Sequence, residues 1–247
     1  MSEDSTVQLL LDVGNTRIKW QLRSSELVES GLANNTEDLF AQLKHVVVDR
    51  ILLSSVRSVK LTDDLVGLIK NQFNCLVLQA VSTLTQCGVS NNYTNPSQLG
   101  VDRWLAVIAG YKLAAGSCIV IDAGSAITID YVDADGVFQG GVIAPGLEML
   151  KQSLKGGTDR VSFESGFSIS KNPLGLSTQA AVSSGVMLML IGFINETLVS
   201  LSRHCYESPA IYITGGDAQS IMPYIDVDLR YVDGLVLDGL AHFFSQG

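Results

Sequence analysis

The feature that most constrains the fold is a motif that occurs twice. An apolar run, an aspartate, one residue, a glycine and a second β-prone run make up LLLDVGNTRIKW at 9–20 and IVIDAGSAITID at 119–130. Two β-prone runs around a glycine-containing turn predict a β-hairpin. Asp12 and Asp122 are separated by nearly half of the chain. An internal repeat of this size predicts two similar α/β halves.

The rest of the chain alternates between helical and extended patterns, which favours an α/β architecture. Helices are predicted at 36–48, 61–73 (capped by Thr62), about 100–115, 145–155, 177–202 and 235–244. Strands are predicted at 50–56, 75–79, 136–143 and 210–214, and polar loops at 86–98 and 156–173. With no low-complexity linker, we place the N-terminal half at 1–115 and the C-terminal half at 116–247.

Composition excludes several classes of protein. With 47% hydrophobic residues in 247, the chain can bury a sizeable core. A net charge of −9 argues against binding to nucleic acid. The four cysteines lack CxxC spacing, so we expect free thiols, with Cys118 in the core. We find no signal peptide pattern and no run of about 18 apolar residues, and expect a cytoplasmic protein without a membrane span.

The first hairpin carries residues suited to phosphate. Asp12 ends a buried strand, where a carboxylate needs a metal or a hydrogen-bond donor. Gly14 permits a close approach of the backbone to a ligand. Asn15 and Thr16 can donate to phosphate oxygens, and Lys19 can add a positive charge. The alternative is an ordinary hairpin with Gly-Asn turn chemistry.

The second copy strengthens the phosphate hypothesis. Asp122, Gly124, Ser125 and Thr128 repeat the arrangement. Two such hairpins can hold a polyphosphate and its Mg²⁺ from both sides, and phosphoryl transfer needs chiefly positioning and charge neutralisation. The alternative is two unrelated hairpins.

Three further segments have both a functional and a structural interpretation. Asp102 starts a predicted helix, where it could simply favour the helix dipole or could accept a proton from a hydroxyl. Arg103 could bind an acidic substrate or form a surface ion pair. Thr178 precedes a long helix, where capping is the ordinary explanation. The glycines of TGGDA at 214–218 fit either a flat ligand or a tight turn.

Taken together, the motifs resemble those of the type III pantothenate kinases, within the acetate and sugar kinase, Hsp70 and actin superfamily. The resemblance covers nearly the whole chain. Its motifs are DVGNTRIKW, YTNPSQLGVDRW, DAGSAITID, GGVIAPG, STQAAVSSG and TGGDA. It implies two ribonuclease H-like halves, each with a mixed sheet flanked by helices and with ATP in the cleft, and a homodimer with the pantothenate pocket near the subunit interface.

The resemblance also implies roles for individual residues. ATP would be contacted by Asp12, Val13, Gly14, Asn15, Thr16, Arg17, Ile18, Lys19 and Ser125. Pantothenate would be contacted by Tyr93, Gly100, Val101, Asp102, Arg103 and Thr178. Asp102 would accept the proton of the attacking hydroxyl, Asp122 would bind K⁺ or NH₄⁺, and Asp12 would hold Mg²⁺ directly or through water. The reaction would convert pantothenate to 4'-phosphopantothenate, the first step of coenzyme A synthesis.

Two positions depart from the family pattern, and two rival functions stay open. Ser125 replaces a common threonine but keeps the hydroxyl, and Val101 replaces a common alanine. One rival is another kinase or phosphatase of the superfamily, acting on a sugar, acetate or polyphosphate. The other is a non-enzymatic regulator, against which the intact Asp12, Asp102 and Asp122 weigh.

Overall fold

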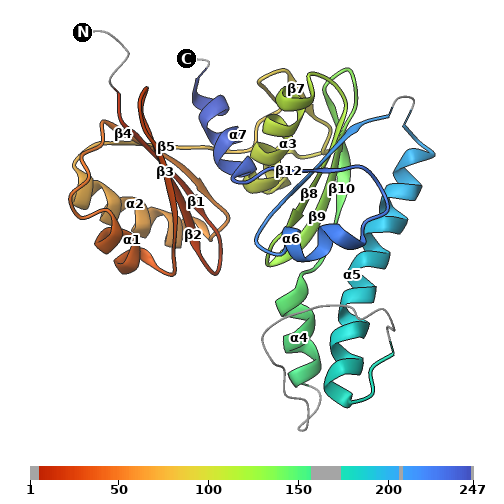
Figure 1. Ribbon diagram of the computed structural model, residues 1–247. Coiled ribbons are helices and arrows are strands. Elements are labelled where there is room, and N and C mark those ends of the chain that lie inside the picture. Colours follow the sequence, from red (N-terminus) through yellow and green to blue (C-terminus); the bar gives the residue numbers. More distant parts are fainter. Residues whose placement is uncertain (1–5, 157–173, 206–207, 246–247) are drawn as a thin grey trace. The chain divides into compact units, whose positions relative to one another are not determined.

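The chain forms two compact units, which we describe separately. The structure, a computed structural model, describes residues 6–156, 174–205 and 208–245 (Figure 1). One unit comprises Met1–Leu113 and Leu235–Gly247, and the other comprises Ala114–Gly234. The units therefore differ from two consecutive halves in one respect, because the C-terminal segment groups with the first unit.

The first unit contains a five-stranded mixed sheet in the order β3-β2-β1-β4-β5. β1 pairs antiparallel with β2 and parallel with β4. The sheet strands are β1 (Gln8–Val13), β2 (Ile18–Arg23), β3 (Val28–Ala33), β4 (Arg50–Ser55) and β5 (Leu76–Gln79). The other elements of this unit are α1 (Thr36–Gln42), α2 (Val59–Phe73), β6 (Thr85–Gln86), β7 (Val89–Asn91), η2 (Pro96–Gln98), α3 (Val101–Ala114) and α7 (Leu235–Phe244).

Both faces of this sheet are covered, as its sequence requires. Leu9 and Leu11 on β1 join a buried cluster with residues of α1 and α2, such as Leu39. Because side chains alternate along a strand, Leu10 points to the opposite face, together with its registered neighbour Leu52. Both are fully buried, and α7 packs against β1 and β4. The burial of both faces explains why the sequence of β1 is a continuous apolar run.

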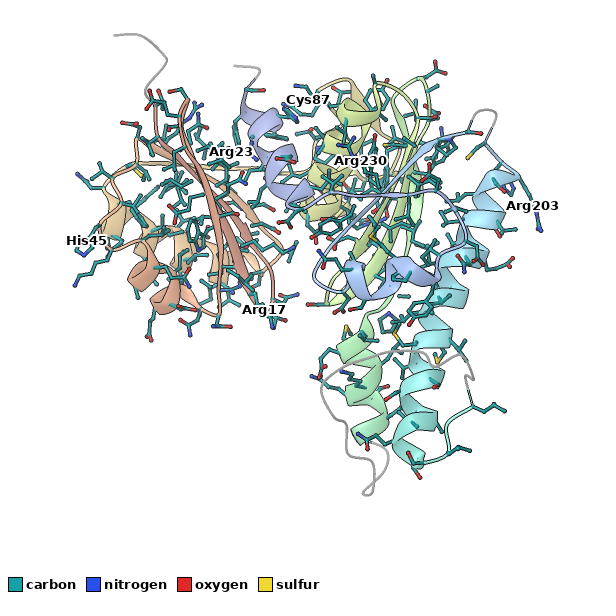
Figure 2. All side chains as sticks on the ribbon, in the orientation of Figure 1. Arg17, Arg23, His45, Cys87, Arg203 and Arg230 are labelled. Atoms are coloured by element: carbon teal, nitrogen blue, oxygen red, sulfur yellow. The ribbon has the colours of Figure 1, made fainter. Side chains whose placement is uncertain are left out.

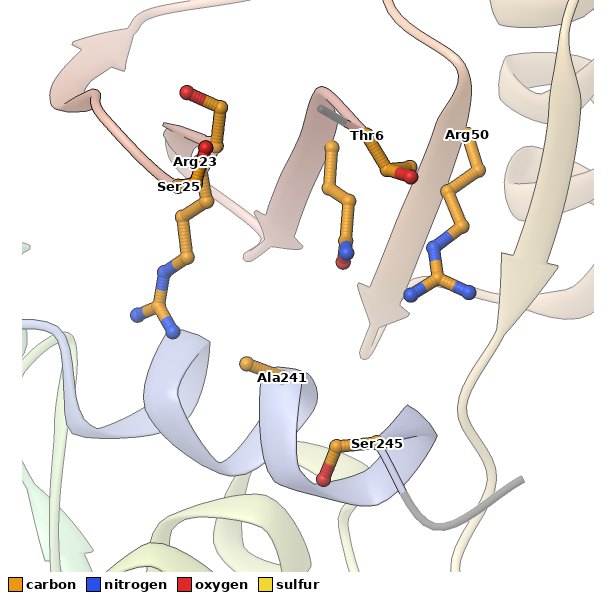
Figure 3. A pocket seen from close by; sticks show the side chains of 8 residues that line it. Thr6, Arg23, Ser25, Arg50, Ala241 and Ser245 are labelled. Atoms are coloured by element: carbon orange, nitrogen blue, oxygen red, sulfur yellow. The ribbon is translucent and has the colours of Figure 1, made fainter. Parts of the chain in front are cut away.

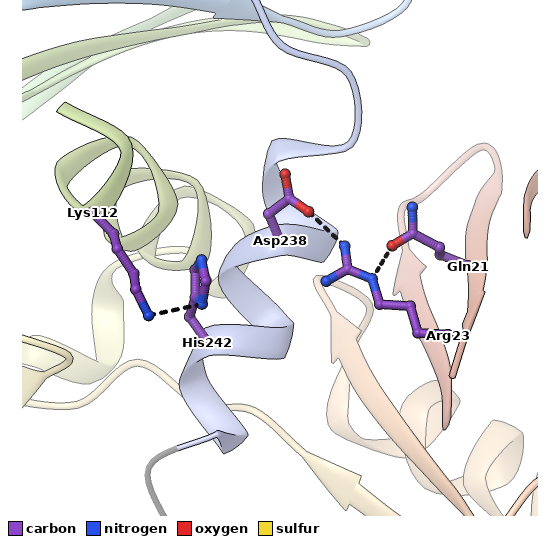
Figure 4. Close-up of polar contacts among 5 residues, drawn as sticks. All are labelled: Gln21, Arg23, Lys112, Asp238 and His242. Carbon is purple, nitrogen blue, oxygen red and sulfur yellow. Dashed lines mark hydrogen bonds and ion pairs between the residues drawn. The ribbon is translucent and has the colours of Figure 1, made fainter. Parts of the chain in front are cut away.

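Helix α7 is held to the rest of the first unit by three kinds of contact, and Figure 4 shows the two polar ones. Asp238 forms an ion pair with Arg23 of β2, with Nη2 and Oδ1 2.5 Å apart. The ammonium of Lys112 on α3 donates to Nδ1 of His242, 3.1 Å away, since an ammonium can only donate. Gly239 lies against the Leu105 carbonyl, where any side chain would collide with the backbone.

The second unit contains a mixed sheet covered by helices. Within this unit the strand order is β12-β11-β8-β9-β10. Ile119 and Ile121 of β8 share one buried cluster with Met187 and Leu190 of the long helix α5. Its elements are β8 (Cys118–Ala123), β9 (Ala126–Val132), β10 (Val137–Pro145), α4 (Leu147–Gly156), α5 (Thr178–Ser202), β11 (Ala210–Thr214), α6 (Ala218–Ile221), η3 (Met222–Tyr224) and β12 (Arg230–Tyr231).

Several local predictions need correction. The helix predicted at 36–48 ends at Gln42, and Asn35 caps it. Thr62 does not cap α2, which begins at Val59; its hydroxyl is buried and lies 2.9 Å from that of Ser55. The loop predicted at 86–98 contains short elements, β7 among them, and β3 and β12 were not predicted. The loop predicted at 156–173 lies outside the described residues after 156.

Helix α5 bears on the expectation that the chain has no membrane span. Its 25 residues include an 18-residue window of mean hydropathy 1.6, enough by length and composition to cross a membrane. Residues such as Val186, Ile194 and Leu198 are nevertheless buried in the cluster of the second unit. The core helix of a folded domain has the same composition, so α5 alone is weak evidence for a membrane protein.

Candidate functional site

The first candidate site is the turn between β1 and β2. The Gly14 amide donates to the Arg17 carbonyl at 3.0 Å and closes the four-residue connection. Asn15, Thr16 and Arg17 are exposed at its tip, and Figure 2 shows Arg17 at that end of the sheet. The exposed amides and hydroxyl of this turn are suited to binding an anion. Val13 and Ile18 are fully buried, so they could contact ATP only through the backbone.

Three polar residues lie side by side on β2, β1 and β4, the two strands of this hairpin and the strand next to β1. Asp12 is in register with Lys19 on β2 and with Ser54 on β4. Registered neighbours point to the same face of a sheet, so a carboxylate, an ammonium and a hydroxyl share one face. Asp12 and Lys19 are half-buried. This arrangement places a carboxylate, a group suited to a metal ion, beside an ammonium, a group suited to phosphate, on adjacent strands.

Arg57 is a residue of this site that sequence reasoning missed. It follows β4, and its Nε donates to the carbonyl of Gly14 at 3.0 Å. Its own amide donates to the Ser55 hydroxyl at 3.3 Å. Arg57 therefore braces the turn from the neighbouring strand. The parallel pairing of β1 and β4 was the signal that could have found it, because their carboxyl ends meet at one sheet edge.

The loop before α3 and the first turn of α3 together carry the predicted substrate residues of the first unit. Arg103 is 8% exposed, and its Nη1 donates to the Tyr93 hydroxyl at 3.1 Å. Asn91, also buried, accepts from the Tyr93 amide at 3.1 Å and donates to the Pro96 carbonyl at 3.2 Å. The loop that carries Tyr93 is therefore fixed by a side chain that sequence reasoning missed.

Asp102 lies in the first turn of α3, beside Arg103. Its Oδ1 accepts from the Arg103 amide at 2.8 Å, as a carboxylate at a helix N-terminus does. A side chain at Gly100 would come within 2.7 Å of this oxygen, so the glycine leaves space around the carboxylate. Val101 and Asp102 are half-buried. The structure therefore brings Tyr93, Asp102 and Arg103 together.

The second hairpin has the same plan with a tighter turn. β8 pairs antiparallel with β9, and Asp122 is in register with Thr128. The turn is Gly124-Ser125, and the Gly124 amide donates to the Ala126 carbonyl at 3.1 Å. Ser125 is exposed at the tip, whereas Asp122 is half-buried. The predicted repeat is thus a structural repeat of strand, turn and strand.

Gly215 and Gly146 allow two other segments of the chain to lie close to this second turn. The Gly215 φ angle of +100° lies where side chains are strained, and a side chain would come within 2.6 Å of Oδ1 of Asp122. Gly146 similarly approaches the carbonyl of Ser125, to which its amide donates at 3.1 Å. The TGGDA motif is therefore packed beside Asp122, which β11 and its parallel pairing with β8 explain.

Thr178 is the first residue of α5 and is exposed. The Ser177 hydroxyl, not that of Thr178, caps this helix by accepting from the Ala180 amide at 3.2 Å. The capping role considered for Thr178 is therefore wrong, because Ser177 fills it. Thr178 and Ser125 belong to the second unit and Tyr93 to the first.

The described cysteines and carboxylates limit which chemistry these sites can use. Burial raises the pKa of the Cys118 thiol to about 12, so the predicted core role of this residue is confirmed and it is a poor nucleophile. Among the described residues, no group of three His, Cys, Asp or Glu side chains could hold a metal. A single carboxylate such as Asp12 is suited to Mg²⁺ that phosphate oxygens and water also coordinate.

Comparisons with solved structures support the fold. A Campylobacter jejuni protein described as a Baf family transcriptional activator is 24% identical, with a TM-score of 0.61 over 94% of this chain and 95% of its own. The ethanolamine utilization protein EutJ from Carboxydothermus hydrogenoformans is 13% identical, with a TM-score of 0.52 over 96% and 89%. The predicted architecture, α/β with two mixed sheets flanked by helices, is confirmed.

Comparisons of sequence go further. The family model described as type III pantothenate kinase matches residues 8–200. A type III pantothenate kinase of Marinobacter nauticus is 36% identical over 245 residues, which is 97% of this chain and 98% of the relative. One of Pseudomonas fluorescens is 34% identical over 242 residues, covering 94% and 97%. The chain belongs to the type III pantothenate kinase family.

Proposed function

We propose that this protein phosphorylates pantothenate with ATP to give 4'-phosphopantothenate, the first step of coenzyme A synthesis. The observation that carries the proposal is the family membership, which extends over nearly the full chain. The hydrogen bond between Tyr93 and Arg103, beside Asp102, supports it. A guanidinium next to a phenol hydroxyl offers donors for the carboxylate of pantothenate.

In the proposed reaction, Arg103 and Tyr93 hold pantothenate so that its primary hydroxyl faces Asp102. Asp102 accepts the hydroxyl proton as the oxygen attacks the γ-phosphate in line. Thr178 contributes a further hydroxyl contact to pantothenate. Because the transition state of phosphoryl transfer is loose, correct positioning contributes more than the strength of the base.

Each unit contributes one hairpin to ATP in this proposal. The turn Gly14–Arg17 and Lys19 bind phosphate oxygens in one unit, and Ser125 binds them in the other. Mg²⁺, when bound, would neutralise charge on the phosphates. Asp12 would hold it directly or through water, and Asp122 would bind a monovalent cation, K⁺ or NH₄⁺.

We also propose a homodimer in the cytoplasm. Exposed apolar side chains on α5, such as Leu188 and Met189, support self-association. Sedimentation equilibrium of the purified protein would measure the assembly, and a monomer at micromolar concentration would contradict the dimer.

The substrate assignment is tested by supplying Mg²⁺ and K⁺ and comparing pantothenate with glucose and acetate as phosphate acceptors. We expect ATP consumption to depend on pantothenate and 4'-phosphopantothenate to accumulate. If ATP is consumed only with glucose or acetate, another kinase of the superfamily is the better assignment. If no acceptor supports turnover, a non-enzymatic regulator is the better assignment.

The role of Asp102 is tested by Asp102→Asn. We expect turnover to fall by roughly 100-fold or more, because the general base is lost, and ATP affinity to stay nearly unchanged. Asp226→Asn, at an exposed position of the second unit, is the matched control. Unchanged turnover in Asp102→Asn would exclude the proposed base.

A further inference from the structure

A cavity in the first unit lies apart from the residues assigned above. It has a volume of about 480 Å³ and is lined by β1, β2, β4 and α7 (Figure 3). This volume is in the range of small-molecule sites. Its lining includes Arg23 and Arg50 together with the hydroxyl-bearing residues Thr6, Ser24 and Ser245. We call this cavity the arginine pocket.

Strand register explains why two arginines meet in this pocket. Gln8 of β1 is in register with Arg23 of β2 and also with Arg50 of β4. The three side chains therefore share one face of the sheet, in the order Arg23, Gln8, Arg50. Adjacent strands lie about 4.8 Å apart, so the two arginine backbones are roughly 10 Å apart. Figure 3 shows the two arginine side chains extending toward α7.

The charges in the arginine pocket are incompletely balanced. Arg23 pairs with Asp238 and donates to Gln21. Nε of Arg50 is buried and has no hydrogen-bond partner among the described residues. A guanidinium is always charged, and a buried donor without a partner is costly. A concentration of positive charge is notable in a chain whose net charge is −9.

The same sheet face carries both this pocket and the phosphate hairpin, at opposite ends of β1. Gln8 and Asp12 are four residues apart on β1, which corresponds to about 13 Å. A ligand in the arginine pocket would therefore not occupy the position of the ATP phosphates at the Gly14 turn.

We propose that the arginine pocket binds a phosphate group, free or carried by a small organic molecule. Phosphate matches the pocket because its oxygens can accept from guanidinium donors on two sides at once, and from the hydroxyls between them. A monocarboxylate has two oxygens on one side and cannot span both arginines. Arg23 is shared between this ligand and Asp238, so the anion and the Asp238 carboxylate compete for one guanidinium.

Binding is tested by isothermal titration calorimetry of the full chain with glycerol 2-phosphate, inorganic phosphate and the monocarboxylate acetate. Mg²⁺ and a saturating non-hydrolysable ATP analogue are present, so that the hairpin sites are already filled. We expect one binding event per chain for a phosphate compound and at least tenfold weaker binding of acetate. A higher affinity for glycerol 2-phosphate indicates an organic ligand, and equal affinity indicates that free phosphate suffices.

Variants identify the pocket. Arg50→Gln should weaken binding at least tenfold while kinase activity without added anion stays at the wild-type level. Asp238→Asn should strengthen binding, because the competing carboxylate is gone. Arg203→Gln, which removes an exposed arginine on the second unit, is the matched control and should bind as wild type.

Ala241→Glu provides a test that leaves both arginines in place. This residue lines the pocket from α7, and a glutamate there should abolish binding by offering its own carboxylate to the guanidiniums. Circular dichroism checks that each variant is folded. The proposal is overturned if wild type shows no binding of either phosphate compound, if acetate binds equally well, or if folded Arg50→Gln and Ala241→Glu bind as wild type.

Discussion

At the scale of single residues, the first site depends on a guanidinium that fixes a turn. Arg57 reaches from the end of β4 to the carbonyl of Gly14, so it determines where the amides of the turn lie. Hydrogen bonds from a charged donor contribute more than those between neutral groups. The position of the turn therefore depends on a residue more than 40 positions further along the chain.

We predict that Arg57→Gln raises the KM for ATP. The loss of one charge-assisted hydrogen bond corresponds to about 1–2 kcal/mol, or roughly a 5- to 30-fold rise in KM. The KM for pantothenate should change much less. Steady-state kinetics with each substrate varied in turn measures both values, with Arg230→Gln, at an exposed position, as the control. Equal increases in both KM values would indicate a general loss of structure instead.

Glycine conformation gives a second residue-scale prediction. Gly215→Ala should weaken ATP binding and stability, because its positive φ strains a side chain and the Cβ would contact the backbone of Ala123. Gly216→Ala is the matched control, since nothing lies within 4 Å of a Cβ there. Calorimetric titration with ATP measures affinity, and thermal melting measures stability. Similar behaviour of the two variants would contradict this account of the turn.

At the scale of elements, the contact between α3 and α7 depends on the missing side chain of Gly239. We predict that Gly239→Ala destabilises the protein by about 1–3 kcal/mol, the usual cost of overpacking a close contact. Gly67→Ala, at an exposed and open position of α2, should instead stabilise by about 0.5–1 kcal/mol through helix propensity. Urea denaturation of both variants checks the sign of each change, and equal signs would contradict the packing argument.

Helix α7 also makes stability depend on pH. Burial, and then the charge of Lys112, lowers the pKa of His242 from its ordinary value of 6.5; Asp238 and Arg23 also act on it, in opposite directions. The unfolded chain therefore binds more protons than the folded chain below about pH 6.5, so stability falls as the pH falls from there toward the folded pKa. Above that window this group has no effect on stability.

We predict that His242→Gln flattens the loss of melting temperature between pH 7.5 and pH 5.5. A glutamine cannot bind the proton that, on His242, lowers the stability of the folded state. His45→Gln, the same substitution at an exposed histidine, is the control. A slope in His242→Gln equal to that of wild type would show that other groups cause the acid destabilisation.

How much could be predicted from the sequence also differs between elements. The hairpins, α7 and β11 followed from local signals: apolar runs, glycines and a strong helical period. β3 was missed because its residues Val28–Ala33 are largely exposed and lack an alternating pattern. Helix 36–48 was predicted too long because Val46–Val48 extends the apolar pattern beyond the point where the backbone leaves the helix at Leu43.

At the site, sequence reasoning found residues that belong to recognisable motifs and missed those that position them. Tyr93 and Arg103 belong to one motif, YTNPSQLGVDRW, and their proximity could be anticipated from it. Arg57 acts through a long-range contact to Gly14, and Asn91 acts through a loop contact to Pro96, five residues away. Such contacts follow from strand order and loop geometry, which a single sequence does not display.

At the scale of the whole molecule, the first unit is assembled from two separated stretches of chain. Residues 235–247 return to it after the second unit is complete. Helix α7 covers the sheet face that carries Leu10 and Leu52 and closes one wall of the arginine pocket. A change in the last helix therefore acts on the unit that carries the first hairpin.

This discontinuity has a consequence for synthesis. A ribosome adds residues in order, at about 5–20 per second, so the first sheet emerges long before the helix that covers it. During that interval the nascent chain displays an apolar sheet face to the surrounding solution, while the second unit has all of its own segments and can close. The order in which the two units mature is therefore the reverse of the order in which they begin, and a chaperone that shields nascent apolar strands would act on the earlier of the two.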